Sequence, residues 1–216
     1  MDECIDNNFL IRINVVLLSL KRSELKFLLI KSKHGNWHLP YTFLSLNENL
    51  EQAAKKIINQ YVNKQKINIF PLKNQESDKK NSLKKTILVN YLSIKKNGKL
   101  RLRINEEITD FNWFHKKEIP NLIYQEKLII DNALEVIKFI IGNYPKEIFN
   151  FLPNEFTLSE LQNSFLNIGL ENKQFKEKRN FRKWINQNSN NKNFIISTSK
   201  MKYGIHRPAK LYKANI

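Results

Sequence analysis

The chain has little of what secreted, zinc-stabilised or membrane-spanning proteins need. Its 216 residues include a single cysteine, Cys4, which excludes a disulfide framework and a cysteine-based zinc site. No run of about 18 apolar residues occurs, so no segment is expected to span a membrane. The start, MDECIDNN, is acidic and polar, unlike a secretory signal. These absences predict a soluble, cytoplasmic protein.

Acidic residues are also scarce. The chain has 37 Lys and Arg against 20 Asp and Glu, which gives a net charge of +17. A general lysine bias would produce this excess without any binding role. The excess is concentrated, however, because residues 151–216 hold 12 basic and 4 acidic side chains and so carry +8. This distribution favours a polyanionic partner for the last third of the chain.

The first 145 residues mix strands with two long helices. Apolar residues spaced by three and four predict a helix from Leu50 to Val62, and Asn49 with Gln52 forms a candidate capping box. A second helix is predicted over 125–141. A polar loop is predicted over 73–85. Strands, one following an Asn97-Gly98 turn, are predicted over 11–19, 25–31, 67–70, 86–94, 100–104 and 109–114.

The residues after 150 follow a different order. Thr157 and Glu160 form a capping box ahead of a helix with Leu161 and Phe165 on its apolar face. A short polar piece, the helix KRNFRKWINQN and two strands over 193–198 and 210–214 follow. This is the element order of a winged helix. We therefore expect two domains, residues 1–145 and 150–216, with a boundary near 142–153.

Residues 37–61, WHLPYTFLSLNENLEQAAKKIINQY, have the layout of a loop and helix that hold a metal-bound diphosphate. They resemble the Nudix box of nucleoside-diphosphate hydrolases, in which Leu-Pro-Gly-Gly-Phe leads into a helix ending Arg-Glu-x-x-Glu-Glu-x-x-Gly. Tyr41 and Thr42 replace the two glycines, and Lys56 replaces the arginine. The matching residues are Leu39, Pro40, Phe43, Glu48, Leu50, Glu51, Ala53 and Ala54.

The three carboxylate positions of that helix hold Ile57, Gln60 and Tyr61, and the closing glycine is Asn63. Magnesium at a diphosphate takes carboxylate oxygens in near-octahedral geometry. Catalysis then uses the metal to stabilise charge and to activate water. Because the carboxylates are missing, we expect no catalytic residue, no metal site, no cofactor and no working hydrolase.

The pocket can still bind a small molecule without a metal. Lys31, Trp37 and Tyr41 are residue types that stack on a ring or meet a phosphate, and with Glu48 they are the candidate effector-binding residues. The competing interpretation is packing beside a loop for the aromatic residues and helix capping for Glu48. Three histidines lack metal-ligand spacing and are interpreted as structural or exposed: His34, His38 and His115.

A helix with basic and amide groups on one face can enter a major groove, where Arg reads guanine and Asn reads adenine. The candidate recognition residues are Lys178, Arg179, Asn180, Arg182 and Lys183. Hydroxyls at a helix N-terminus (Thr157, Ser159) can meet a phosphate, and the expected wing carries Lys202, His206 and Arg207. A solvated basic face is the competing interpretation, but the basic hairpin that follows the helix favours nucleic acid.

FTLSELQ, KRNFRKW and HRPAKLYK resemble the C-terminal domain of the Nudix-related transcriptional regulators, the NrtR-like family. DFNWFHKKEIPNLIYQEKLIIDNAL resembles the end of their Nudix-like domain, although Tyr124 and Gln125 replace the family's Asp-His pair. The resemblance covers residues 8–212. It implies an α+β chain, in which an N-terminal Nudix-like α/β/α sandwich precedes a C-terminal winged helix-turn-helix domain.

The resemblance also implies a homodimeric repressor that binds double-stranded operator DNA and senses a small-molecule effector with its Nudix-like domain. In regulators of NAD metabolism the effector is ADP-ribose or a related nucleotide, and in sugar-pathway relatives it is a pentose. The ligand would favour one arrangement of the dimer and so change the spacing of the two winged helices. Two alternatives stay open: a divergent Nudix hydrolase with an accessory basic domain, and a basic RNA-binding protein without an effector.

Overall fold

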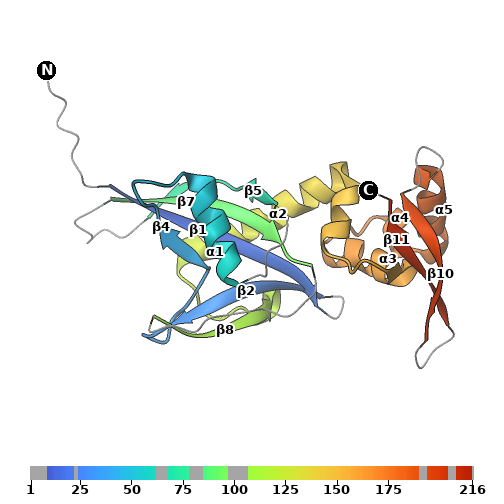
Figure 1. The fold of residues 1–216 in the computed structure, drawn as a ribbon, viewed down its shortest axis with the longest axis horizontal. Coiled ribbons are helices and arrows are strands. Elements are labelled where there is room, and N and C mark those ends of the chain that lie inside the picture. Colours follow the sequence, from blue (N-terminus) through green and yellow to red (C-terminus); the bar gives the residue numbers. More distant parts are fainter. Residues whose placement is uncertain are drawn as a thin grey trace, which may run out of the picture. The chain divides into compact units, whose positions relative to one another are not determined.

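The computed structural model describes residues 9–21, 24–61, 68–77, 85–96, 107–189, 194–203 and 208–215 (Figure 1). Its helices are α1 (Leu50–Tyr61), α2 (Tyr124–Asn143), α3 (Leu158–Asn167), α4 (Lys173–Lys176) and α5 (Lys178–Ser189), with short 3-10 helices η1 (Lys116–Glu118) and η2 (Pro145–Asn150). Its strands are β1 (Phe9–Lys21), β2 (Glu24–Ser32), β3 (Trp37–His38), β4 (Tyr41–Phe43), β5 (Ile69–Pro71), β6 (Gln75–Glu76), β7 (Lys85–Ile94), β8 (Ile108–His115), β9 (Phe156–Thr157), β10 (Ile195–Lys202) and β11 (Ala209–Ala214).

The described residues form two compact units that divide inside α2, between Ala133 and Leu134. The first unit holds most of the large sheet, α1 and the first half of α2. The second unit holds the chain from Leu134 onward, together with the adjoining ends of β1 and β2 and residues 95–96. The domain boundary expected near 142–153 stays a prediction. No helix in the described ranges is long and apolar enough to cross a membrane.

The first unit is built on a mixed sheet with the strand order β3-β2-β1-β7-β5, in which β4 also pairs with β1, β6 with β7 and β8 with β2. Strands β1 and β7 run parallel over ten residue pairs. Residues of β1 are buried on both faces, as expected for a central strand covered by two layers. Helix α1 lies across one face in Figure 1 and packs on Ile13, Val15 and Leu17. The alternate residues of β1 face α2, because Arg12 pairs with Glu126.

Helix α1 begins and packs as its sequence predicts. The Asn49 side chain accepts a hydrogen bond from the Gln52 N–H at 2.8 Å, and the Gln52 side chain accepts one from the Asn49 N–H at 3.0 Å. This reciprocal capping box satisfies two amides that the helix itself leaves without partners. The apolar side of the helix is buried through Ala53, Ala54, Ile57, Ile58 and Tyr61.

Four long strands lie where the sequence predicts them, and the structure adds several short strands that were not predicted. The predicted segments 11–19, 25–31, 86–94 and 109–114 are strands, each with slightly wider bounds. Strands β3, β4, β6 and β9 were not predicted, and β6 lies inside the segment expected to be a loop. These strands are only two or three residues long, and their pairing to distant strands leaves no periodic pattern in the sequence. The predicted 100–104 strand and its Asn97-Gly98 turn lie outside the described residues.

The second unit contains α3, α4 and α5, followed by the antiparallel hairpin of β10 and β11. The short strand β9 adds to β11 and completes a three-stranded sheet with the order β10-β11-β9. Helix α3 starts with the predicted capping box of Thr157 and Glu160 and buries Leu161 and Phe165. Gly169 follows its end at φ +92°, a left-handed conformation that glycine adopts without strain. The order helix, short helix, basic helix and hairpin is therefore present.

Candidate functional site

Helix α5 presents a basic surface to solvent. Lys178, Arg179, Arg182 and Lys183 are exposed, whereas Phe181 is buried beneath them. The first turn of α5 contains no acidic residue. Positive charge near a helix N-terminus opposes the helix dipole and slightly destabilises the helix. The basic residues of α5 therefore do not stabilise this helix through its dipole.

An aromatic cluster fixes α5 on the two helices before it. The Trp184 ring makes edge-to-face contacts with Phe165, Phe175 and Phe194, at centroid distances of 5.4, 5.2 and 5.3 Å. Phe165 and Phe175 stack at 4.6 Å. The buried Gln162 amide donates to the Phe175 carbonyl at 2.8 Å, which satisfies a backbone group at the end of α4. The basic side chains of α5 thus project from a rigid base.

Two predicted phosphate contacts, Thr157 and Ser159, lie at the N-terminus of α3 and differ in exposure. Thr157 is buried, and its hydroxyl accepts the Glu160 N–H at 3.2 Å, so this hydroxyl serves the helix cap. Ser159 is exposed and keeps an accessible hydroxyl. The structure therefore favours Ser159 over Thr157 as the hydroxyl that could meet a phosphate.

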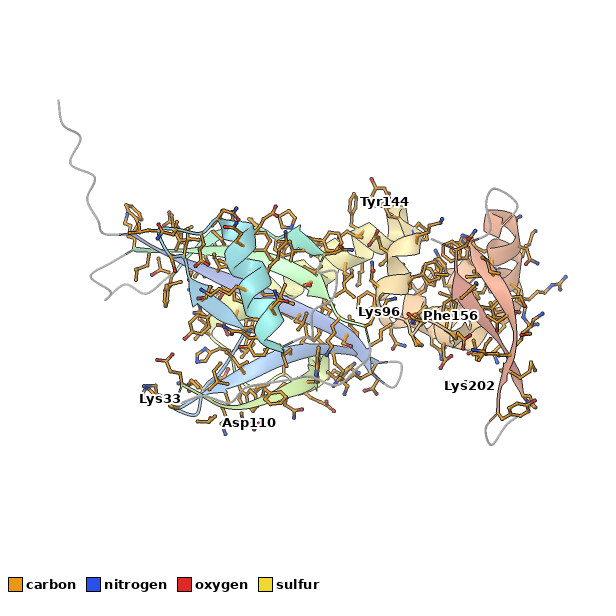
Figure 2. The ribbon with its side chains drawn as sticks, viewed as in Figure 1. Lys33, Lys96, Asp110, Tyr144, Phe156 and Lys202 are labelled. Carbon is orange, nitrogen blue, oxygen red and sulfur yellow. The ribbon has the colours of Figure 1, made fainter. Side chains whose placement is uncertain are left out.

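The expected wing is represented by Lys202 on β10, labelled in Figure 2, whose ammonium lies 2.5 Å from Glu160 Oε1. Burial alone would raise the pKa of Glu160, but hydrogen bonds from Lys202 and Thr157 outweigh burial and lower this pKa below its ordinary value. Lys202 is thus tied to α3 by an ion pair with Glu160. His206 and Arg207 lie outside the described residues.

The first unit contains a buried charge cluster at Tyr41. The Arg12 guanidinium lies 3.9 Å from the Tyr41 ring centroid and donates to Glu126 Oε1 at 2.6 Å. Glu126 is 1% exposed and also accepts the Leu39 N–H at 3.3 Å. His38 Nδ1 lies 3.7 Å from the same carboxylate. Tyr41, at a position where the Nudix loop has glycine, therefore covers this charged pair.

The other predicted effector residues, Lys31, Trp37 and Glu48, make contacts that do not involve the Arg12–Glu126 pair. Lys31 and Trp37 are paired across β2 and β3, with the Lys31 ammonium 5.8 Å from the Trp37 ring centroid. The Trp37 ring packs edge-to-face on Phe114 at 4.9 Å. Glu48 accepts the Ser45 N–H at 3.1 Å, and its hydrogen bonds to Ser45 lower its pKa. Glu48 therefore stabilises the turn before α1.

The positions that carry metal ligands in a Nudix helix do not fit a metal here. Ile57 and Tyr61 are buried in the core and Gln60 is exposed. Burial, together with the nearby Tyr41, raises the pKa of Tyr61 to about 12, so its hydroxyl stays protonated and is a poor metal ligand. Within the described part of the chain, no three His, Cys, Asp or Glu side chains are grouped so as to hold a metal ion.

Sequence reasoning missed Arg12, Glu126 and the role of His38. The pairing of Arg12 with Glu126 spans 114 residues, so no local pattern reveals it. Arg12 gave a signal, because it interrupts an apolar strand, whereas Glu126 lies between Gln125 and Lys127 and gave none. Charged residues at buried positions need a partner.

Together, the sheet with its two helices and the second unit define a Nudix-like domain followed by a winged helix domain. Residues 148–214 match the family model of the NrtR DNA-binding winged helix domain. The resemblance to NrtR-like proteins seen in the sequence is thereby confirmed for the C-terminal domain. No curated protein sequence matches the chain significantly.

Two solved structures match nearly the whole chain, and a third matches part of it. NrtR of Shewanella oneidensis in complex with a 27mer DNA matches with a TM-score of 0.70 and 21% identity, over 95% of this chain and 93% of that chain. A MutT/nudix family protein from Enterococcus faecalis matches with a TM-score of 0.70 and 19% identity, over 96% and 88%. The NUDIX domain of the Shewanella NrtR, complexed with ADP ribose, matches with a TM-score of 0.52 and 20% identity, over 59% and 88%. These similarities confirm the predicted fold class.

Proposed function

We propose that this chain is a ligand-responsive, DNA-binding transcriptional regulator that acts as a repressor. The winged helix binds operator DNA, and the Nudix-like domain senses ADP-ribose, a related nucleotide or a sugar without hydrolysing it. The observation that carries the proposal is the exposed basic face of α5 inside a domain that matches the NrtR DNA-binding winged helix. A similar chain from Shewanella oneidensis has been crystallised with DNA, which supports the same partner here.

The residues of α5 proposed to contact DNA are Lys178, Arg179, Asn180, Arg182 and Lys183. In winged helix and helix-turn-helix proteins this helix enters the major groove, while a wing and neighbouring helices contact the backbone. Ser159, Lys202, His206 and Arg207 are proposed as backbone contacts. Because these basic residues would neutralise DNA phosphates, the affinity for DNA should fall steeply as the salt concentration rises.

The sensor role is supported by the structure of α1. A Nudix hydrolase needs carboxylates where this helix has Ile57, Gln60 and Tyr61, and two of these three side chains are buried in the core. The fold of the domain is retained, and the similar NUDIX domain of Shewanella NrtR has been crystallised with ADP ribose. The residues proposed to bind the effector are Lys31, Trp37, Tyr41 and Glu48.

Two copies of the chain are proposed to act together, since a two-fold dimer would read a palindromic operator with one winged helix for each half-site. An effector changes operator affinity only to the extent that it binds the two dimer arrangements with different affinities.

The direct experiment measures binding of the full chain to its own upstream region by fluorescence anisotropy. Arg182→Ala is expected to weaken promoter binding by about 1–3 kcal/mol if Arg182 contacts a base. Lys127→Ala removes an exposed positive charge on α2 and serves as the control. Promoter affinity unchanged in both Arg182→Ala and Arg179→Ala would reject α5 as the recognition helix.

The same preparation tests the competing functions. Magnesium-dependent turnover of ADP-ribose that Glu48→Gln abolishes would favour a divergent hydrolase. Binding to structured RNA as tight as to a palindromic promoter would favour an RNA-binding protein.

A further inference from the structure

A shallow hollow of about 330 Å³ lies between α4 and α5. It is lined by two ammonium groups, three side-chain amides and one indole: Lys173, Gln174, Asn180, Lys183, Trp184 and Gln187. Among the residues that the structure describes, neither Lys173 nor Lys183 has an ion-pair partner. By contrast, the neighbouring Lys176 pairs with Glu171 at 3.1 Å. In the described part of the chain, two lysines without an ion-pair partner on one concave surface attract an anion, and the one carboxylate hydrogen-bonded to a lining residue, that of Glu177, is held by Asn180.

The walls of this hollow are held in place before any ligand arrives. The Trp184 indole is fixed against Phe165 and Phe175, so the α5 side cannot easily move. Helix α4 is held by the Gln162 amide. Asn180 already donates to Glu177 Oε2 at 2.8 Å, which leaves the two lysines as the groups most able to hold an anion. A preformed site of this kind loses little conformational entropy on binding.

The hollow also divides the polar residues of α5 into two sets. Asn180, Lys183 and Gln187 are spaced by three and four and face α4. Arg182 is two residues from Asn180 and therefore points about 160° away around the helix axis. Arg179 and Arg182 do not line the hollow. Asn180, Lys183 and Gln187 thus line the hollow, and Arg182 lies on the side of α5 away from Asn180. Arg179, four residues before Lys183, lies next to Lys183 on the helix surface without lining the hollow.

In helix-turn-helix docking the second helix enters the major groove while the helix before it crosses the backbone. A hollow between those two helices lies where the groove meets the phosphates. Resting on the DNA-binding function proposed above, we propose that Lys173 and Lys183 seat one backbone phosphate in this hollow and so set the register of α5. Arg179 and Arg182 then remain to contact base edges.

The first test compares Lys173→Gln and Lys183→Gln with Lys176→Gln, which removes one charge from the same helix as Lys173 but outside the hollow. Duplex binding of the full chain is measured at several salt concentrations, with the promoter and with a scrambled duplex. Lys173→Gln and Lys183→Gln, the two hollow variants, are each expected to weaken binding to both duplexes by the same factor. Each should also reduce the magnitude of the slope of log K against log salt by about 1. Lys176→Gln should leave the slope unchanged, and circular dichroism confirms that each variant folds.

The second test locates the phosphate. A series of promoter duplexes each carries one uncharged methylphosphonate. The wild type should lose affinity at one position in each half-site, and Lys183→Gln should be insensitive at that same position.

Three outcomes would overturn the inference. If both hollow variants keep the wild-type slope of log K against log salt while Arg182→Ala still loses promoter binding, the hollow does not seat a phosphate. The proposed function would then remain intact. A loss confined to the promoter would show that the lysines read bases. A rise in melting temperature with inorganic phosphate that Lys183→Gln abolishes, without any sensitive phosphate in the duplex series, would indicate a site for a small free anion. Absence of duplex binding by the wild type would instead refute the proposed function itself.

Discussion

At the scale of single residues, Glu126 shows how an ionised group is kept inside the first unit. Its carboxylate is almost fully buried and is compensated by the Arg12 guanidinium and the Leu39 amide. Taking a charge out of water costs several kcal/mol unless partners of this quality are present. The cluster therefore contributes more to the position of Tyr41 and the loop around Leu39 than to net stability.

Arg12→Leu should destabilise the fold, because it leaves a buried charge unpaired. The variant leaves the Glu126 carboxylate without its charged partner, so the free energy of unfolding should fall by about 3–5 kcal/mol. Urea denaturation followed by circular dichroism measures this loss. The double variant Arg12→Leu with Glu126→Gln removes both charges but keeps an acceptor for the Leu39 N–H, and it should recover part of the stability. A single variant within about 1 kcal/mol of the wild type would contradict the argument.

Local patterns in the sequence predict side-chain exposure well and long-range pairing poorly. The helical period of α5 was sufficient to separate the buried Phe181 from the exposed Arg179 and Arg182. The same reasoning interpreted His38 as a structural or exposed residue and gave no role to Glu126, because their contacts join segments far apart in the chain. The candidate DNA-binding residues could therefore be selected from the sequence, whereas the charge cluster beneath Tyr41 could not.

At the scale of secondary-structure elements, the ends of two helices carry glycines with different requirements. Gly169 ends α3 in the left-handed region, and a Cβ there would lie 2.5 Å from Cε of Lys138. Because a lysine end can move, the backbone conformation rather than this contact makes substitution costly. Gly142 in α2 has ordinary backbone angles and would place a Cβ 3.9 Å from Leu170 Cδ2, an ordinary contact.

Gly169→Ala should therefore lower stability by about 1 kcal/mol or more, whereas Gly142→Ala should leave it unchanged or raise it by up to about 1 kcal/mol. Thermal unfolding of the two variants beside the wild type measures the difference. Equal effects of the two substitutions would show that the left-handed conformation of Gly169 is not required.

The capping box of α3 makes a prediction about pH. Glu160 has a lowered pKa in the folded chain, so its contribution is present above the ordinary value of 4.5 and is lost as pH falls through the folded-state pKa. Glu160→Gln keeps a capping acceptor but loses the charge near Lys202, which should cost about 0.2–1 kcal/mol at pH 7. Melting temperatures between pH 7 and pH 3 test this.

The difference between wild type and Glu160→Gln should shrink as the solution becomes acidic. The matched variant Glu171→Gln removes an exposed carboxylate that pairs only with Lys176 and caps no helix in the described structure. A difference for Glu160→Gln that stays constant or grows toward pH 3 would refute the assigned role of this carboxylate.

At the scale of the whole molecule, the order of elements was predictable because each long helix and strand carries its own period. The hydrophobic pattern gave α1, α2, α3 and α5 and the strands β1, β2, β7 and β8. The short strands β3, β4, β6 and β9 depend on pairing partners elsewhere in the chain and could not be read locally. The fold class could therefore be predicted, while the exact sheet order required the structure.

The last prediction concerns the coupling between the two proposed sites. If ADP-ribose changes the affinity of the full chain for its promoter by some factor, the promoter duplex must change the affinity for ADP-ribose by the same factor. Allosteric coupling is usually worth about 1–3 kcal/mol, or roughly 5- to 150-fold. Calorimetry of ADP-ribose binding with and without saturating duplex, beside duplex titrations with and without ADP-ribose, measures both factors. A pentose takes the place of ADP-ribose in a parallel series. If a ligand binds tightly but leaves the affinity for the duplex unchanged, it is not the sensed effector. A ligand with equal affinity for the two dimer arrangements does not change their populations.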